Sequence, residues 1–164
     1  MKHVAKKIRR IVTGHDENGN SMVWMDDYAT NAKTPTEDIT STLLWSSDEM
    51  PIDYMKDEDY GARIVGTAPP ANGIRFIIFE MAPHSAKSAF HKTDTLDYVV
   101  CLEGEMIHHM DKGFVTLKPG DVLIQRGTNH CWENRGDVPA RLVIVLVDGK
   151  PKRTSSISGK ENAR

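Results

Sequence analysis

The sequence predicts an all-β fold in one domain of 164 residues, and two observations support this. First, about seven short stretches rich in β-branched and aromatic residues follow one another at close, even spacing between residues 74 and 148. Second, Gly, Pro, Asn and Asp separate these stretches, and no helical period lies between them. This arrangement is typical of a β-sandwich or barrel.

The N-terminal part predicts an arm and a loop. Residues 4–12, the Asn18-Gly19 pair and residues 22–25 predict a β-hairpin, because Asn-Gly readily adopts the positive φ of a tight turn. Residues 26–40 are polar and are expected to be irregular, with a short strand at 41–45. Residues 46–73 predict a long loop, and loops of this length in a compact domain are often functional.

The C-terminal part supplies the predicted barrel. Its strands are expected at residues 74–81, 96–102, 105–110, 114–117, 122–126, 130–133 and 140–147. The chain is therefore divided into a hairpin arm and long loop packing on the barrel (1–73), the barrel (74–148) and a flexible basic tail (149–164).

Composition excludes several classes of protein. A net charge of −2 gives no reason to expect nucleic acid as a partner. No apolar stretch reaches the roughly 20 residues that span a membrane, and no apolar region follows the basic residues 1–10 as in a signal peptide. Two cysteines, Cys101 and Cys131, make no disulfide framework, so a cytoplasmic location is predicted.

Two histidines carry the strongest chemical signal. His91 lies in FHKTDTLDYVVCLEGE (90–105) and His130 in KPGDVLIQRGTNHCWEN (118–134), each next to a glycine turn. Asp97 follows His91 at an even spacing, so on a regular strand both side chains point to one face. Two imidazoles and a carboxylate converging inside a barrel are a known ligand set for a mononuclear metal centre.

These two segments resemble the two sequence motifs of the cupin superfamily. In the first motif, the two His positions, the acidic position and the closing Gly fall on His91, Thr93, Asp97 and Gly104. In the second, Gly120, Gly127, His130 and Asn134 fit, with one residue fewer before the inner Gly and Arg126 in place of the usual Pro. The resemblance covers residues 74–148. It implies a jelly-roll β-barrel that forms a homodimer and has an N-terminal arm.

The departures from the motif decide what the resemblance implies about metal. Cupin metal sites usually contain three His and one Glu, whereas Thr93 and Asp97 replace one His and the Glu here. His91, Asp97 and His130 remain, a set suited to Fe, Mn, Ni or Zn. The alternative is a barrel without metal, in which His91 and Asp97 bond to each other.

Three functions stay open at this point. The first is a metal-dependent decarboxylase, dioxygenase, isomerase or lyase whose catalytic residues are His91, Asp97, His130 and Arg126. Its substrate would be a small oxygen-rich molecule such as a carboxylate or β-dicarbonyl, with Arg126 as an anion clamp unless Arg126 forms a surface ion pair. The others are a metal-free small-molecule-binding module and a metal-free acid/base enzyme using His91 and Asp97.

Other polar residues receive simpler interpretations. His108 and His109 are adjacent on one strand, so they point to opposite faces; a surface position is expected, and the alternative is that one of them points inward and adds a ligand. Trp132 shares the His130 face and is expected either to line the pocket or to pack in the core. Asn134 is predicted to brace a turn, and His84 to lie in a solvated loop.

Overall fold

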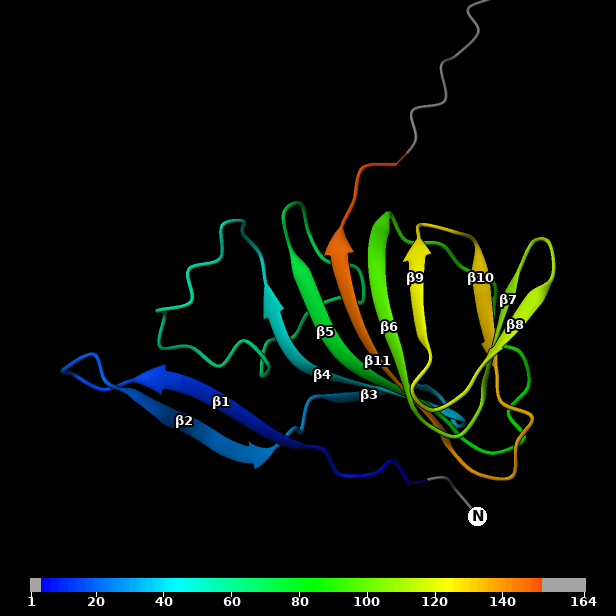
Figure 1. The fold of residues 1–164 in the computed structure, drawn as a ribbon, viewed down its shortest axis with the longest axis horizontal. Helices are drawn as coiled ribbons and strands as arrows, with labels where there is room; N and C mark the ends of the chain where they lie inside the picture. Colours follow the sequence, from blue (N-terminus) through cyan, green and yellow to red (C-terminus); the bar gives the residue numbers. More distant parts are fainter. Residues whose placement is uncertain (1–3, 152–164) are drawn as a thin grey trace, which may run out of the picture.

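The computed structural model describes residues 4–151 and is all-β in that range (Figure 1). Its strands are β1 Arg9–His15, β2 Ser21–Tyr28, β3 Ala32–Thr36, β4 Ile39–Ser47, β5 Ile74–Met81, β6 Thr95–Glu103, β7 Met106–Met110, β8 Phe114–Leu117, β9 Val122–Arg126, β10 His130–Glu133 and β11 Ala140–Asp148. A six-stranded sheet in the order β3-β4-β5-β11-β6-β9 faces a three-stranded sheet in the order β10-β7-β8. All pairings are antiparallel. The predicted all-β, jelly-roll barrel is confirmed.

The alternation along β6 shows how the sequence fills the barrel. Val99 and Cys101 point inward and are 0% and 1% exposed, whereas Tyr98 between its inward neighbours is 47% exposed. Successive strand residues face opposite sides, so the apolar inward set packs against residues from both sheets. The core that results contains Leu43, Ile77, Met81, Val99, Cys101, Met106, Leu117, Trp132, Ala140, Leu142, Ile144 and Leu146.

The hairpin predicted at the N-terminus is confirmed. β1 and β2 pair with each other, Gly19 takes the positive φ of the turn at 79°, and the hairpin extends away from the barrel (Figure 1). Its base is fixed to the rest of the chain by Arg10, whose guanidinium bonds to Asp59 and Asp27 at 2.7–3.1 Å. The arm is therefore tied to the long loop as well as to itself.

The expectation that residues 26–40 are irregular was wrong. β2 continues to Tyr28, β3 occupies Ala32–Thr36, and β4 begins at Ile39 and pairs with β5 along most of its length. These segments form strands because they pair with neighbouring strands of the sheet. The stability gained from that pairing outweighs their low local β-propensity. β3 and β4 belong to the large sheet, so strands from before residue 74 help to build the barrel.

The segment from Asp48 to Gly73 has no strand, as predicted for the long loop. It folds back over one end of the sheet, where Val65 packs against the core. Asn31 donates to the carbonyl oxygens of Gly61 and Arg63 at 2.9 and 2.7 Å and so holds this part of the loop in place. Residues 152–164, most of the predicted flexible tail, lie outside the described residues. No helix suited to crossing a membrane occurs within residues 4–151.

Candidate functional site

The structure brings His91 and His130 together. Each backbone N–H donates to the other residue's carbonyl oxygen at 2.9 Å, and the two imidazole centroids are 4.2 Å apart. His130 begins β10, whereas His91 lies just before β6, so this bridge closes one end of the barrel. His130 is buried and His91 is exposed.

Backbone carbonyls fix the orientation of both rings. His91 Nδ1 lies 3.0 Å from Ala89 O, and His130 Nδ1 lies 2.9 Å from Thr128 O. A carbonyl oxygen only accepts, so each Nδ1 carries the proton, and in the neutral ring Nε2 keeps its lone pair. Burial, the largest cause, lowers the pKa of His130 to about 4, so this ring is neutral at physiological pH.

Behind the imidazoles, a buried chain of three polar side chains crosses the barrel. Gln125 lies opposite Asp97 in the β6–β9 pairing and donates from Nε2 to Asp97 Oδ2. Gln125 Oε1 accepts from His108 Nε2 at 2.7 Å. Asp97, Gln125 and His108 are 2%, 4% and 1% exposed. Burial is the largest cause of two shifts: it raises the pKa of Asp97 and lowers the pKa of His108.

The two ends of this chain have free acceptor atoms. Within residues 4–151, Asp97 Oδ1 and His108 Nδ1 are buried and no hydrogen bond within 3.5 Å reaches them, although the Thr95 hydroxyl lies near enough to Asp97 to oppose the rise in its pKa. Buried polar atoms are nearly always satisfied by protein, water or a bound group, so these two atoms mark a place where a ligand or water is expected. No hydrogen bond joins Asp97 to His91 in the described part of the chain, but the two lie close enough for the charge of His91 to oppose the rise in the pKa of Asp97.

The expectation that His108 and His109 lie on the strand surface was wrong. Both are buried, at 1% and 6% exposure, and they do point to opposite sides of β7. His108 faces inward and contacts Trp132 and His130 with ring centroids 4.5 and 5.2 Å away. His109 on the other side bonds to Glu133 at 2.8 Å. Both faces of β7 are covered, which its short sequence does not reveal.

Arg126 does not join the other three predicted site residues. It is exposed and lies on the outside of the barrel near Lys92 and Asp94, while its neighbour Gln125 faces the interior. The sequence analysis did not identify Gln125 as a site residue, although adjacent strand residues face opposite sides and only one of the two can face the cavity. His84 lies in an exposed loop, its own φ is 55°, and its Nε2 lies 3.1 Å from Asp137 Oδ1.

A cavity of about 140 Å³ opens beside the imidazoles. Two aromatic rings, Phe79 and Trp132, with centroids 6.2 Å apart, form part of its wall. Polar groups on the wall come from Ser41, Thr67, Thr93, Gln125 and the two imidazoles, and the remaining lining is Pro35, Ile39, Ile77, Val99, Ile144 and Leu146. An apolar cavity of roughly 150 Å³ accommodates benzene, so this one suits a ring-sized apolar body.

The donor atoms beside the cavity fit a metal in their chemistry. Within residues 4–151, no three His, Cys, Asp or Glu side chains are already gathered closely enough to hold a metal ion. Two Nε2 lone pairs and the free Asp97 Oδ1 are suitable ligands, and Gln125 holds Oδ2 as ligating carboxylates usually are held.

Trp132, expected either in the pocket or in the core, contributes to both.

Comparisons with known proteins agree with this fold. A family model described as a cupin domain matches residues 77–146. The cupin-domain-containing oxidoreductase virC of Hypocrea virens is 30% identical over 152 residues, covering 87% of this chain and 76% of the relative. The phomopsin biosynthesis cluster protein C' of Diaporthe leptostromiformis is 31% identical over 155 residues, covering 87% and 79%. The crystal structure of TT1209 from Thermus thermophilus has a TM-score of 0.50 at 16% identity, covering 73% of this chain and 92% of that chain, and supports the fold alone.

Proposed function

Because this chain belongs to the cupin superfamily, we propose that it is a metal-dependent oxidoreductase acting on a small molecule bound in the barrel cavity. The observation that carries the proposal is the pair His91 and His130, with ring centroids 4.2 Å apart and both Nδ1 atoms facing carbonyls. Relatives named as oxidoreductases favour redox chemistry over the other cupin reactions.

The metal would be held by His91 Nε2, His130 Nε2 and Asp97. A divalent ion bound there would act as a Lewis acid toward the oxygen atoms of a substrate. Iron or manganese would in addition supply a redox centre. Asp97 contributes a negative charge inside the barrel, which a bound cation would stabilise against the cost of burial. Gln125 keeps that carboxylate oriented, and His108 in turn fixes the orientation of the Gln125 amide.

The cavity wall indicates the kind of molecule that binds. Phe79 and Trp132 present apolar surface and exclude water, while Thr93 and Gln125 offer a few polar groups near the imidazoles. Such a mixture of apolar wall and few polar groups is common in small-molecule sites. The substrate we propose has an apolar body of about one ring and an oxygen-bearing end directed at the imidazoles.

Metal analysis of the purified protein tests the proposal. We expect about one equivalent of iron, manganese, nickel or zinc in the wild type, and loss of that metal in the double variant His91→Ala/His130→Ala. Asp97→Asn should weaken binding about 10-fold to 100-fold, because it keeps the shape but removes the charge. His84→Ala serves as the matched control, since His84 lies in an exposed loop. Absence of metal from the wild type, even after reconstitution, would contradict the proposal and leave a binding module as the better description.

A further inference from the structure

A second, smaller cavity adjoins the one beside the imidazoles. Its volume is about 30 Å³, and it shares three wall residues, Ser41, Thr67 and Ile77, with the larger cavity. Three cationic side chains also line it: Lys33, Arg63 and Arg75. The two adjoining cavities thus form an apolar compartment next to the imidazoles and, beyond the shared residues, a cationic compartment whose Lys33 is exposed.

Arg75 belongs to the inner wall of the barrel. Every second side chain of β5 points to the same side of the sheet. Arg75 therefore lies in one row with Ile77 and Phe79, with about 7 Å between successive members. Arg75 is only 4% exposed. Its Nη1 donates to Ser47 O and Asp48 Oδ1 at 3.2 and 2.9 Å, but its Nε is buried without a partner among the described residues. An unpaired buried donor on a charged group is costly, which points to an acceptor that binds in this compartment.

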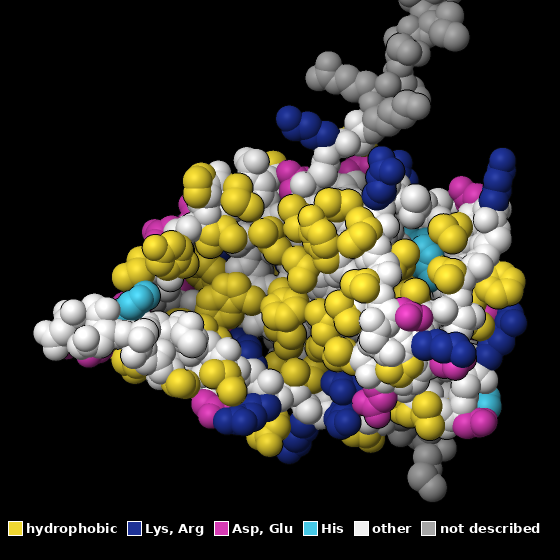
Figure 2. All heavy atoms as spheres, viewed as in Figure 1, with side chains coloured by type: hydrophobic (Ala, Val, Ile, Leu, Met, Phe, Trp, Pro, Cys, Tyr) yellow, Lys and Arg dark blue, Asp and Glu magenta, His cyan; other side chains and the backbone are white. Residues whose placement is uncertain are grey.

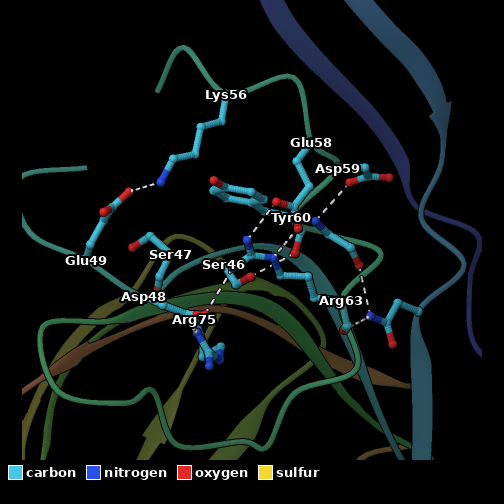
Figure 3. Close-up of polar contacts among 12 residues, drawn as sticks. Ser46, Ser47, Asp48, Glu49, Lys56, Glu58, Asp59, Tyr60, Arg63 and Arg75 are labelled. Atoms are coloured by element: carbon cyan, nitrogen blue, oxygen red, sulfur yellow. Dashed lines mark hydrogen bonds and ion pairs between the residues drawn. The ribbon is translucent and has the colours of Figure 1, made fainter. Parts of the chain in front are cut away.

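The charges around this cavity do not cancel. Figure 3 shows Asp48 and Glu58 beside the two arginines: Asp48 is shared by Arg63 and Arg75 at 3.0 and 2.9 Å, and Glu58 bonds to Arg63. Lys33 donates to the carbonyl oxygen of Val65, which carries no charge. Three cations and two carboxylates leave one positive charge. The compartment therefore favours a single negative charge.

We infer that the cationic compartment is a carboxylate subsite, so that the substrate is a small apolar carboxylic acid. Its acid end would pair with Arg75 and Lys33, while its apolar body fills the larger cavity and its other end meets His91 and His130. The size of the compartment selects the anion, because about 30 Å³ holds roughly two water-sized atoms, which matches the two oxygens of a carboxylate better than the four of a phosphate. This inference rests on the proposed function and assigns to Arg75 the clamp that the sequence suggested for Arg126.

Binding of a matched acid and amide tests the subsite. Phenylpropanoate and phenylpropanamide share an apolar body and differ in charge, and calorimetry gives the affinity of each. We expect wild type to prefer the acid about tenfold, and Lys33→Gln and Arg75→Lys to reduce that preference while leaving the affinity for the amide unchanged. Arg126→Gln, on the outer surface, should keep the full preference. Thermal midpoints of all variants separate a lost subsite from a lost fold.

The double variant His91→Ala/His130→Ala separates this inference from the proposed function, because a carboxylate also binds metal. Retention of the acid preference in the double variant supports the subsite whether or not metal analysis finds an ion. Loss of the preference there, together with a full preference in Arg75→Lys, would place the acid at the imidazoles and overturn the subsite alone. Equal affinity of wild type for acid and amide would also overturn it.

Discussion

The side-chain amide of Gln125 connects Asp97 to His108 across the interior of the barrel. It donates to Asp97 Oδ2 and accepts from His108 Nε2, and all three side chains are at most 4% exposed. This contact fixes which end of the amide is oxygen and which is nitrogen, because a carboxylate accepts and the His108 N–H must donate. One residue thereby sets the orientation of a predicted metal ligand and of an inward-facing imidazole.

Replacing Gln125 with Leu should be costly. The substitution leaves a buried carboxylate oxygen and a buried imidazole N–H without partners, so we expect the free energy of unfolding to fall by about 2 to 4 kcal/mol. It should also raise the pKa of Asp97 further, because the Gln125 bond opposes the effect of burial. Urea unfolding measures the first effect. The matched control is Arg126→Leu at the exposed neighbour, where a change within about 0.5 kcal/mol is expected. Equal losses in both variants would contradict the assigned role.

Protonation of His130 should make the metal-free protein less stable in acid. Burial lowers the folded-state pKa of His130 to about 4, while the unfolded chain keeps a value near 6.5. Between these values the unfolded state binds a proton that the folded state does not, so the free energy of unfolding falls as pH falls from 6.5 to 4. The loss attributable to this group is at most about 3 kcal/mol.

Denaturant unfolding in the presence of a chelator, at several pH values between 4 and 7, checks this dependence. In His130→Asn, the free energy of unfolding should depend less on pH in that window than it does in wild type. In His84→Asn, a change in the exposed loop, it should follow the wild-type pH dependence. If the His130→Asn curve runs parallel to wild type throughout, the ring is not held neutral by the fold.

Asn134 stabilises the turn that follows β10. It is 0% exposed, its Nδ2 donates to Met81 O, Ala82 O and Val138 O at 2.9–3.2 Å, and its Oδ1 accepts from Gly136 N. Asn134→Ala should therefore reduce the free energy of unfolding by about 2 to 3 kcal/mol, measured by urea unfolding. Asn129→Ala offers the control, because Asn129 is only half-buried and its side chain donates to Asp111 on the surface. A loss below about 0.5 kcal/mol for Asn134→Ala would be inconsistent with this bracing role.

The sequence predicted those elements whose pattern is local. β5, β8, β9 and β10 begin and end at the predicted residues, because Gly, Pro, Asn or Asp stands close to each end of these short segments. β3 was missed because Ala32–Thr36 is polar and exposed, and only its pairing with β4 makes it a strand. Local composition does not contain that information.

The site was predicted in part for a related reason. Asp97 and His130 were expected inside from the alternation of their strands, and both are buried. Gln125 and Arg126 differ by one position, and the register of β9 against β6 decides which of the two points inward. Arg75 attracted no attention in the sequence, since a cation in an apolar strand gains its meaning only when the neighbouring loop supplies Asp48.

The outer face of the large sheet leads to a final prediction, a homodimer. Figure 2 shows apolar side chains gathered over this face, and the outward residues Phe76, Tyr98, Val122 and Ile124 are 36–69% exposed. Exposed apolar patches of this kind usually mark a protein interface, and a second copy of the same face would bury them symmetrically.

Light scattering after size exclusion should therefore give twice the chain mass for wild type. Ile124→Glu should give the single-chain mass with unchanged circular dichroism, since a charge buried in the centre of an apolar interface lacks a partner. Phe114→Glu, at a position that is 62% exposed on β8 in the other sheet, should remain dimeric. A single-chain mass for wild type would contradict the prediction, and dissociation by Phe114→Glu alone would move the interface to the smaller sheet.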